Sequence, residues 1–151
     1  MLLFGDSKKI LNLYLLCKKC FMKAIIKEYY SIDIHDLFGF QPDDPTHFGF
    51  NLELILAPDE GPLQNSEDMF NVFICSPSYL PELMKKIYPP SDVIFGKHLI
   101  FANHYNFERI LSTITNYILS VEGQTWEEVA LKINRIARWE FEDYKPFADP
   151  K

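Results

Sequence analysis

The chain has 151 residues, 48% of them hydrophobic and 24% charged, and its formal net charge at pH 7 is −6. These values are typical of one globular domain and exclude a disordered chain. No apolar run approaches the roughly 18 residues that a membrane-spanning helix needs. The odd count of three cysteines argues against a disulfide framework and suits a reducing compartment.

The first 21 residues differ in composition from the rest of the chain. They combine four lysines with a short apolar patch at residues 10–17, which Asn12 interrupts. The patch is short for a signal peptide, and no small-residue cleavage site follows it. We therefore expect residues 1–21 to be an N-terminal extension without a part in the function, and residues 22–151 to form a single domain. An added amphipathic helix is the alternative for the extension.

Acidic residues are concentrated in one part of the sequence. From Glu28 to Met84 there are eleven acidic residues and no lysine or arginine. A surface of this kind repels nucleic acid and membranes, and it attracts a basic protein. We therefore expect neither nucleic acid nor a membrane as a direct partner. Ordinary solubility is the other explanation of the charge.

Three stretches in the first half predict β-strands. Residues 22–30 are apolar and β-branched, residues 48–56 alternate with a period of two, and residues 69–75 place three apolar side chains on one face. Residues 31–46 between the first two strands are rich in turn-forming residues. The turn-rich linker at residues 57–66 joins the second and third strands into a hairpin.

A short helix and a fourth strand follow the hairpin. Ser76 or Ser78 can cap the helix, which has Pro81 in its first turn. The helix is expected to reach about Tyr88, because the two prolines that follow stop it. Residues 97–105 then alternate as a further strand.

Two longer helices are predicted in the last third of the chain. Asn106 caps the first, whose apolar residues form one stripe. Thr125 and Glu128 form a capping box at the start of the second, which we expect to continue to about residue 138. Early strands with helices gathered late predict an α+β fold, with an antiparallel sheet of about four strands and helices packed on one face. The strand order cannot be read from the sequence.

Few residues carry catalytic chemistry. There is no phosphate-binding glycine loop and no G-x-S-x-G nucleophile elbow. The four histidines show no metal-ligand spacing, and Cys17 and Cys20 lack the second ligand pair of a zinc site. We therefore expect no enzyme, no cofactor and no metal. A small enzyme with an acidic pocket is the alternative, because sequence does not show whether two carboxylates face one another across a pocket.

Two elements combine aromatic residues with carboxylates in a way that a scaffold does not require. The first is a loop with Asp43 and Asp44 that leads into Phe48-Gly49-Phe50. Its two phenylalanines follow the strand alternation and are expected in the core. Its two aspartates are either turn formers or binding residues.

The second element is the tail after the last helix. We expect Trp139 and Phe141 to fold back onto the sheet. Glu140, Glu142 and Asp143 would then point outward near a helix C-terminus, where negative charge opposes the helix dipole. Because stability does not favour carboxylates there, the pattern favours a binding role for them.

Both elements resemble the motifs of the immunity protein 8 family, small antidotes encoded beside bacterial polymorphic toxins. The first is similar to that family's P-D-D and F-G-F stretches, here at residues 42–44 and 48–50. The second is similar to its T-W-E-E and R-I-x-x-W-E-F-E-D-Y stretches, here at residues 125–128 and 135–144. The resemblance covers residues 22–144, and Ala137 departs from the expected glycine while keeping a small residue.

The resemblance implies an α+β immunity protein that protects a bacterium by binding a cognate toxin domain stoichiometrically, without turnover. It also implies action in the cytoplasm, on toxin that has entered or has not yet left. A nuclease with a basic cleft is one toxin that an acidic antidote suits. A non-catalytic regulatory module is the remaining alternative. Neither the activity of the toxin nor the oligomeric state can be read from the sequence.

We expect acidic residues of the loops and the tail to rim the interface, with one tyrosine as an aromatic anchor. These partner-binding residues are Asp43, Asp44, Asp59, Glu60, Glu140, Glu142, Asp143 and Tyr144. Another group of motif residues is expected to have a structural role, and Trp126 in particular is assigned to the core. This group is Phe48, Gly49, Phe50, Trp126, Trp139 and Phe141.

Overall fold

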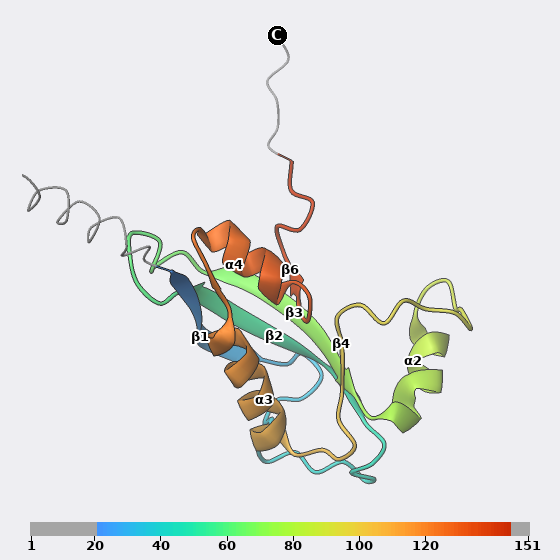
Figure 1. Ribbon diagram of the computed structural model, residues 1–151. Helices are drawn as coiled ribbons and strands as arrows, with labels where there is room; N and C mark the ends of the chain where they lie inside the picture. Colours follow the sequence, from blue (N-terminus) through green and yellow to red (C-terminus); the bar gives the residue numbers. More distant parts are fainter. Residues whose placement is uncertain (1–20, 146–151) are drawn as a thin grey trace, which may run out of the picture.

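The computed structural model describes residues 21–145, and the predictions for residues 1–20, including their C-x-x-C pair, lie outside this part (Figure 1). Three long antiparallel strands form the centre of one sheet: β1 (Met22–Tyr30), β2 (Gly49–Pro58) and β3 (Asp68–Cys75). All three were predicted close to these bounds, and β2 and β3 form the predicted hairpin.

Three short strands extend the sheet and make it mixed. β4 (Leu99–Phe101) lies parallel to β3, β5 (Glu122–Gly123) pairs with β1, and β6 (Arg138–Trp139) pairs with β3. The spatial order is β4-β3-β2-β1-β5, and β6 shares one edge of β3 with β4. The predicted α+β class is confirmed, whereas an antiparallel sheet of about four strands is wrong in the strand number and in the direction of β4.

The fourth strand is shorter than the predicted residues 97–105, because β3 offers only part of its edge. β4 pairs with residues 73–75 of β3, and β6 pairs with Phe70 and Asn71. Beyond β4 the chain leaves the sheet. The N–H of Tyr105 donates to the carbonyl of Pro45 at 2.8 Å rather than to a strand.

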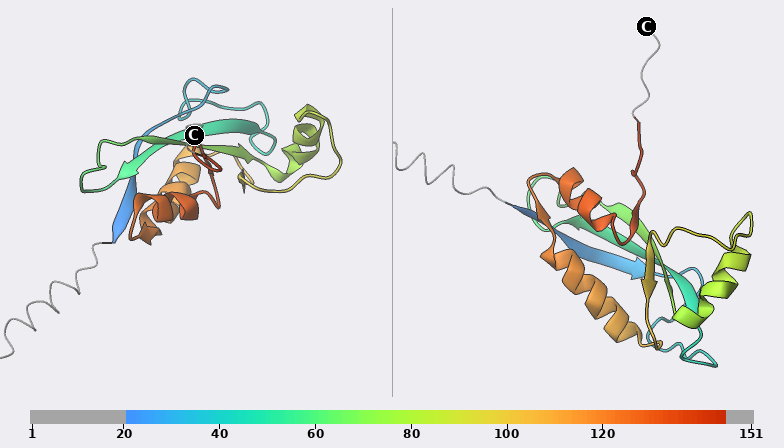
Figure 2. Two further views of the ribbon diagram at one scale, coloured as in Figure 1. Left: turned by 90° about the horizontal axis from the view of Figure 1, so that it is seen from above. Right: turned by 45° about the vertical axis from the view of Figure 1, so that its right-hand side comes forward.

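Two helices, α3 (Phe107–Ser120) and α4 (Trp126–Ile133), pack on one side of the sheet. The predicted caps are confirmed, since the side chains of Asn106 and Thr125 accept hydrogen bonds from the backbone N–H three residues on, at 3.0 and 3.2 Å. Figure 2 shows both helices below the sheet in its left-hand view. Packing of these helices on one face was predicted.

The short helix after the hairpin stands apart from α3 and α4, at one end of the sheet (Figure 2). A 3-10 turn, η1 (Pro77–Tyr79), leads into α2 (Leu80–Lys86). Ser76 occupies the predicted N-cap position, at the start of η1, but neither η1 nor α2 has a side-chain capping hydrogen bond. The Ser78 hydroxyl instead donates to a backbone carbonyl of the loop before β2, at 2.7 Å.

The last helix ends at Ile133 rather than near residue 138. The side-chain oxygen of Asn134 accepts a hydrogen bond from the N–H of Trp139 at 2.8 Å, which stabilises the turn into β6. The acidic tail therefore follows a strand and not a helix. Its carboxylates therefore do not oppose a helix dipole, contrary to the prediction.

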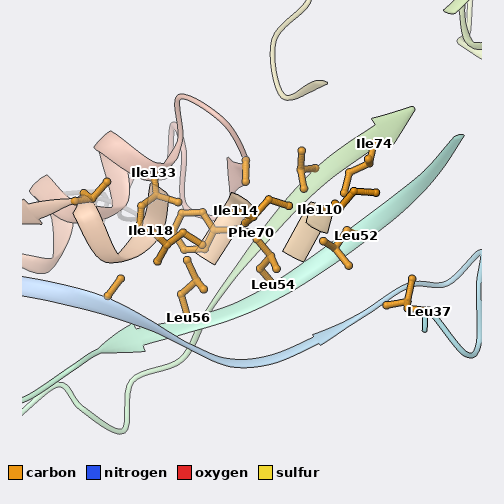
Figure 3. Packing of buried hydrophobic residues seen from close by; sticks show 14 of the residues in the cluster. Leu37, Leu52, Leu54, Leu56, Phe70, Ile74, Ile110, Ile114, Ile118 and Ile133 are labelled. Atoms are coloured by element: carbon orange, nitrogen blue, oxygen red, sulfur yellow. The ribbon is translucent and has the colours of Figure 1, made fainter. Parts of the chain in front are cut away.

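The core lies between the sheet and the two helices (Figure 3). Leu52, Leu54 and Leu56 of β2 are fully buried there, because alternate residues of a strand share one face. We call this the inner face of the sheet. The helices cover it with Phe107, Ile110, Ile114 and Ile118 of α3 and with Trp126, Val129, Ala130 and Ile133 of α4.

We call the opposite side of the sheet the outer face. It is defined by strand residues that alternate with the core residues, namely Glu28, Tyr30, Asn51, Glu53, Ile55, Met69, Asn71, Phe73 and Arg138. Tyr79 stacks on Phe73 at one end, with 6.2 Å between the ring centroids. Within residues 21–145, no helix covers the middle of this face (Figure 2).

Candidate protein-binding surface

The loop before β2 exposes both of its predicted binding aspartates. Asp44 forms a turn, since its Oδ1 accepts hydrogen bonds from the hydroxyl and the N–H of Thr46 at 2.6 and 2.8 Å. These bonds, the hydroxyl bond foremost, hold the pKa of the Asp44 carboxyl below its usual value. Asp43 accepts no hydrogen bond from another described side chain or backbone N–H. The Asp44 carboxylate is therefore charged at neutral pH, and Asp43 is the freer of the two side chains.

The turn between β2 and β3 holds the next predicted pair. Asp59 Oδ1 accepts a hydrogen bond from the N–H of Lys23 at 3.1 Å, which ties the turn to β1. Glu60 is exposed. Gly61 follows with a φ of 92°, a conformation that glycine adopts without steric penalty.

The tail after β6 contains four of the predicted binding residues, of which two make structural contacts and two are exposed. Glu140 Oε1 accepts a hydrogen bond from the N–H of Met69 at 2.6 Å, which extends the pairing with β3. Glu142 forms an ion pair with Lys97, and this contact is the main reason that the pKa of its carboxyl is lowered. Asp143 is exposed and Tyr144 is 67% exposed. Those two remain available for a partner.

The eight predicted residues lie in three separate groups rather than in one patch. The loop with Asp43 and Asp44 precedes the first residue of β2, and the turn with Asp59 and Glu60 follows its last. A strand of 10 residues separates them by about 33 Å. The tail lies beside β3 instead, because β6 pairs with that strand.

The motif at the start of β2 has a structural role, as expected. Phe48 and Phe50 are 5% and 1% exposed. Gly49 lies between them under Tyr79, and a Cβ at this position would come within 2.3 Å of the Tyr79 ring. Only glycine fits, because the ring is held by its stacking on Phe73.

The two tryptophans of the second motif converge on one carboxylate. The indole N–H groups of Trp126 and Trp139 donate to Asp68 Oδ2 at 2.7 and 2.8 Å. Asp68 is 8% exposed and belongs to the inner side of β3. Trp139 also stacks on Phe70, whereas Phe141 packs against Trp139 and stays 42% exposed. The two hydrogen bonds to Asp68, which we call the clamp, join α4 and β6 to the sheet. The sequence did not predict Asp68 as their acceptor.

A serine, a histidine and a glutamate come together between the loop and α2. His47 Nδ1 lies 3.1 Å from Ser78 Oγ, and Nε2 lies 3.2 Å from Glu82 Oε2. This chain of contacts from serine to histidine to glutamate resembles the catalytic triad of a hydrolase. However, the Ser78 hydroxyl donates to the carbonyl of Thr46 at 2.7 Å, so its proton is not directed at the imidazole. This geometry favours a structural tie and does not favour the enzyme alternative.

A further exposed aromatic segment connects α2 to β4 (yellow in Figure 1). Tyr88 is 97% exposed, Phe95 is 95% exposed and Val93 is 78% exposed. The sequence reading placed Tyr88 at a helix end and assigned Phe95 no role. Their fully solvated side chains are a signal that only the fold reveals.

Two kinds of feature are absent from residues 21–145. No group of three His, Cys, Asp or Glu residues there is placed to hold a metal ion. None of the helices in that range has both the length and the apolar surface for crossing a bilayer.

Comparison with known families gives one match. A family model described as immunity protein 8 matches residues 24–144. The chain belongs to the immunity protein 8 family. Membership implies an immunity protein that acts against a polymorphic toxin, and all eight predicted binding residues fall within the matched range. Neither a search of curated proteins nor a search of solved structures found a match.

Proposed function

We propose that this immunity protein neutralises a cognate bacterial toxin domain by binding it stoichiometrically and covering its active site, without catalysing a reaction. The observation that carries the proposal is the family match over residues 24–144. The protein would act in the cytoplasm, with residues 22–151 as its single domain and residues 1–21 as a dispensable extension.

The exposed charges support a basic target. Asp43, Asp44 and Glu60 stand on loops at the two ends of β2 and are open to solvent. Carboxylates on such loops steer a basic protein toward the complex and raise the association rate. A nuclease domain with a basic cleft is a target of this kind, and the immunity protein itself would not bind the nucleic acid.

Aromatic side chains supply the remaining requirement. Tight complexes depend on a few desolvated anchors, most often tyrosine, tryptophan or arginine. Tyr144 fits that role, because it is 67% exposed and contacts only Phe141 among the described aromatic rings. Tyr88 and Phe95 are further candidates, since both are almost fully exposed.

The test is co-expression with the toxin domain encoded in the neighbouring gene. Growth rescue and a stable complex after purification are expected for the wild-type protein. The double substitution Asp43→Lys and Asp44→Lys should slow association about tenfold at low salt, with less effect at high salt. The association rates at low and at high salt are measured by surface plasmon resonance with a catalytically inactive toxin.

Two outcomes would count against the proposal in different ways. Folded wild-type protein that neither rescues growth nor binds the toxin would remove the proposed function. Unchanged association of the double variant would remove only the loop with Asp43 and Asp44 from the interface. Truncation at Met22 should leave rescue unchanged, and loss of rescue would show that the extension has a function.

A further inference from the structure

The outer face is hollowed along β2 and β3. One hollow of about 480 Å³ lies beside α2 and has Asn51 and Phe73 on its floor. A second hollow of about 290 Å³ is bordered by Glu53, Met69, Asn71, Arg138 and Glu140. The two adjoin, because Asn51 and Glu53 are alternate residues on one side of β2. We call the surface made by these two neighbouring hollows, from α2 to β6, the outer groove.

Glu53 on the floor of the outer groove has one carboxylate oxygen without a partner. Its Oε1 accepts a hydrogen bond from Asn71 Nδ2 at 2.7 Å. Its Oε2 is buried and has no hydrogen-bond donor among residues 21–145. A buried acceptor without a donor destabilises a protein, and the penalty is larger for a charged group. Such an atom requires an explanation, and a donor supplied by a partner is one.

The charges around the groove favour a basic donor. Glu28, Glu53 and Glu140 lie on or beside it, and Arg138 is the one cation that residues 21–145 place in its middle. Arg138 takes part in none of the ion pairs within residues 21–145. Lys86 at the α2 end is already paired with a glutamate of its own helix at 2.6 Å. The middle of the groove is therefore acidic.

We infer that the outer groove is the docking site of the toxin, and that a lysine or arginine side chain of the toxin donates to Glu53. The inference rests on the proposed function and specifies its interface. Because Oε2 itself is buried, the Glu53 side chain must rotate into the hollow that it borders for a guanidinium or ammonium group to donate to this oxygen. The surrounding carboxylates then stabilise the charge of that group. The apolar side chains of Met69 and Ile55 beside Glu53 provide contact for the stem of such a residue.

The location of the groove also accounts for the scattered acidic groups. It runs along β2 between the loop with Asp43 and the turn with Glu60. A standard interface buries roughly 800 Å² on each partner, so one toxin lying along β2 reaches both ends. The helix-covered inner face offers no comparable surface, because α3 and α4 occupy it.

The first experiment compares Glu53→Gln with Glu127→Gln. Glu127 is an exposed carboxylate on α4, on the other side of the molecule. Glu53→Gln should weaken binding of the inactive toxin domain about tenfold or more, whereas Glu127→Gln should leave the dissociation constant unchanged. The melting temperature of free Glu53→Gln should stay equal or rise, since the substitution removes a buried charge. A residue that only supports Asn71 would instead lower the melting temperature and leave the affinity intact.

A second pair of variants tests the groove independently of Glu53. Met69→Arg places a bulky cation in the groove, at a position that is 36% exposed. The control Leu131→Arg places the same side chain on α4, away from the groove, at a position that is 50% exposed. We expect Met69→Arg to abolish growth rescue and Leu131→Arg to preserve it. Circular dichroism confirms that each variant is folded before binding is measured.

The outcomes separate the inference from the function on which it rests. If wild-type protein binds the toxin and both groove variants bind equally well, the outer groove is not the docking site and the proposed function stands. If the wild-type protein itself does not bind, the proposed function fails first. Weakened binding of both groove variants, with intact controls, supports the inference.

Discussion

The inner and outer faces of the sheet are built by alternating residues of the same strands, yet only one of them is closed. On β3, Phe70 points to the inner face and is fully buried, whereas its neighbour Met69 points to the outer face and is 36% exposed. On β2, three buried leucines alternate with Asn51 and Glu53. The inner face is the product of packing, and the outer face keeps polar groups that packing does not need.

Two carboxylates make the difference between the faces concrete. Asp68 on the inner side accepts hydrogen bonds from two indole N–H groups, so its burial is compensated. Glu53 on the outer side leaves a buried oxygen without a donor within the described residues. Buried polar groups stabilise when they are satisfied and destabilise when they are not. We therefore assign Asp68 to the fold and Glu53 to binding.

The largest expected effect is a difference in stability between substitutions at Phe70 and at Met69, which are neighbours on β3. Phe70→Ala should lower the free energy of unfolding by about 3–5 kcal/mol, because it opens a cavity beneath Trp139. Met69→Ala should lower it by about 1 kcal/mol or less, since that side chain is partly solvated. Urea denaturation measures both values. Equal losses would show that the outer face is packed as closely as the inner face and would break the comparison.

A smaller loss is expected when the clamp on Asp68 is removed. Asp68→Ala leaves two buried indole N–H groups without an acceptor, and it should lower the free energy of unfolding by about 2–4 kcal/mol. Asp68→Asn keeps one oxygen and should lose less. Tryptophan fluorescence during urea denaturation follows both environments directly.

The control compares the double variant Trp126→Phe and Trp139→Phe with the triple variant that also carries Asp68→Ala. Because neither variant contains tryptophan, circular dichroism follows their unfolding in urea. In that background the aspartate has no indole donors, so Asp68→Ala should be nearly neutral or stabilising. If the loss stays the same with and without the tryptophans, the two hydrogen bonds do not carry the effect. The buried carboxylate would then require another partner.

Local patterns predicted most of the central sheet and both long helices. The period-2 alternation of β2 and β3 and the caps Asn106 and Thr125 depend on residues close together in the sequence, and all were confirmed. The mixed sheet could not be predicted in the same way. β4 and β6 are short, and each depends on which part of the edge of β3 is left free.

The candidate site shows the same limit more strongly. Sequence identified acidic residues that are mostly exposed, but their separation along β2 depends on the fold. The acceptor of both tryptophans was missed because Asp68 lies 58 and 71 positions from them. Glu53 was treated only as the polar partner in a strand alternation. Its unsatisfied oxygen becomes visible when the register places Asn71 opposite.

The smallest expected effect concerns the edge between the two faces, where Glu142 of the tail pairs with Lys97. The pKa of Glu142 is lowered below its ordinary value of 4.5, first by the bond from Lys97 and then by one from Asn134. A lowered pKa in the folded state means that the stabilisation is complete above pH 4.5 and is lost as the pH falls through the lower folded value. Because the pair is partly solvated, it contributes about 1 kcal/mol or less.

The measurement is the free energy of unfolding from pH 7 down to about pH 3 for the wild-type protein and Glu142→Gln. Their difference should be constant at neutral pH and should shrink toward zero in acid. Lys97→Gln should give a similar profile, since it removes the main cause of the shift. A difference that persists in acid would mean that Glu142 stabilises the tail through its shape rather than its charge. Glu142 would then belong to the packed scaffold, and of the predicted tail residues only the exposed Asp143 and Tyr144 would remain for binding.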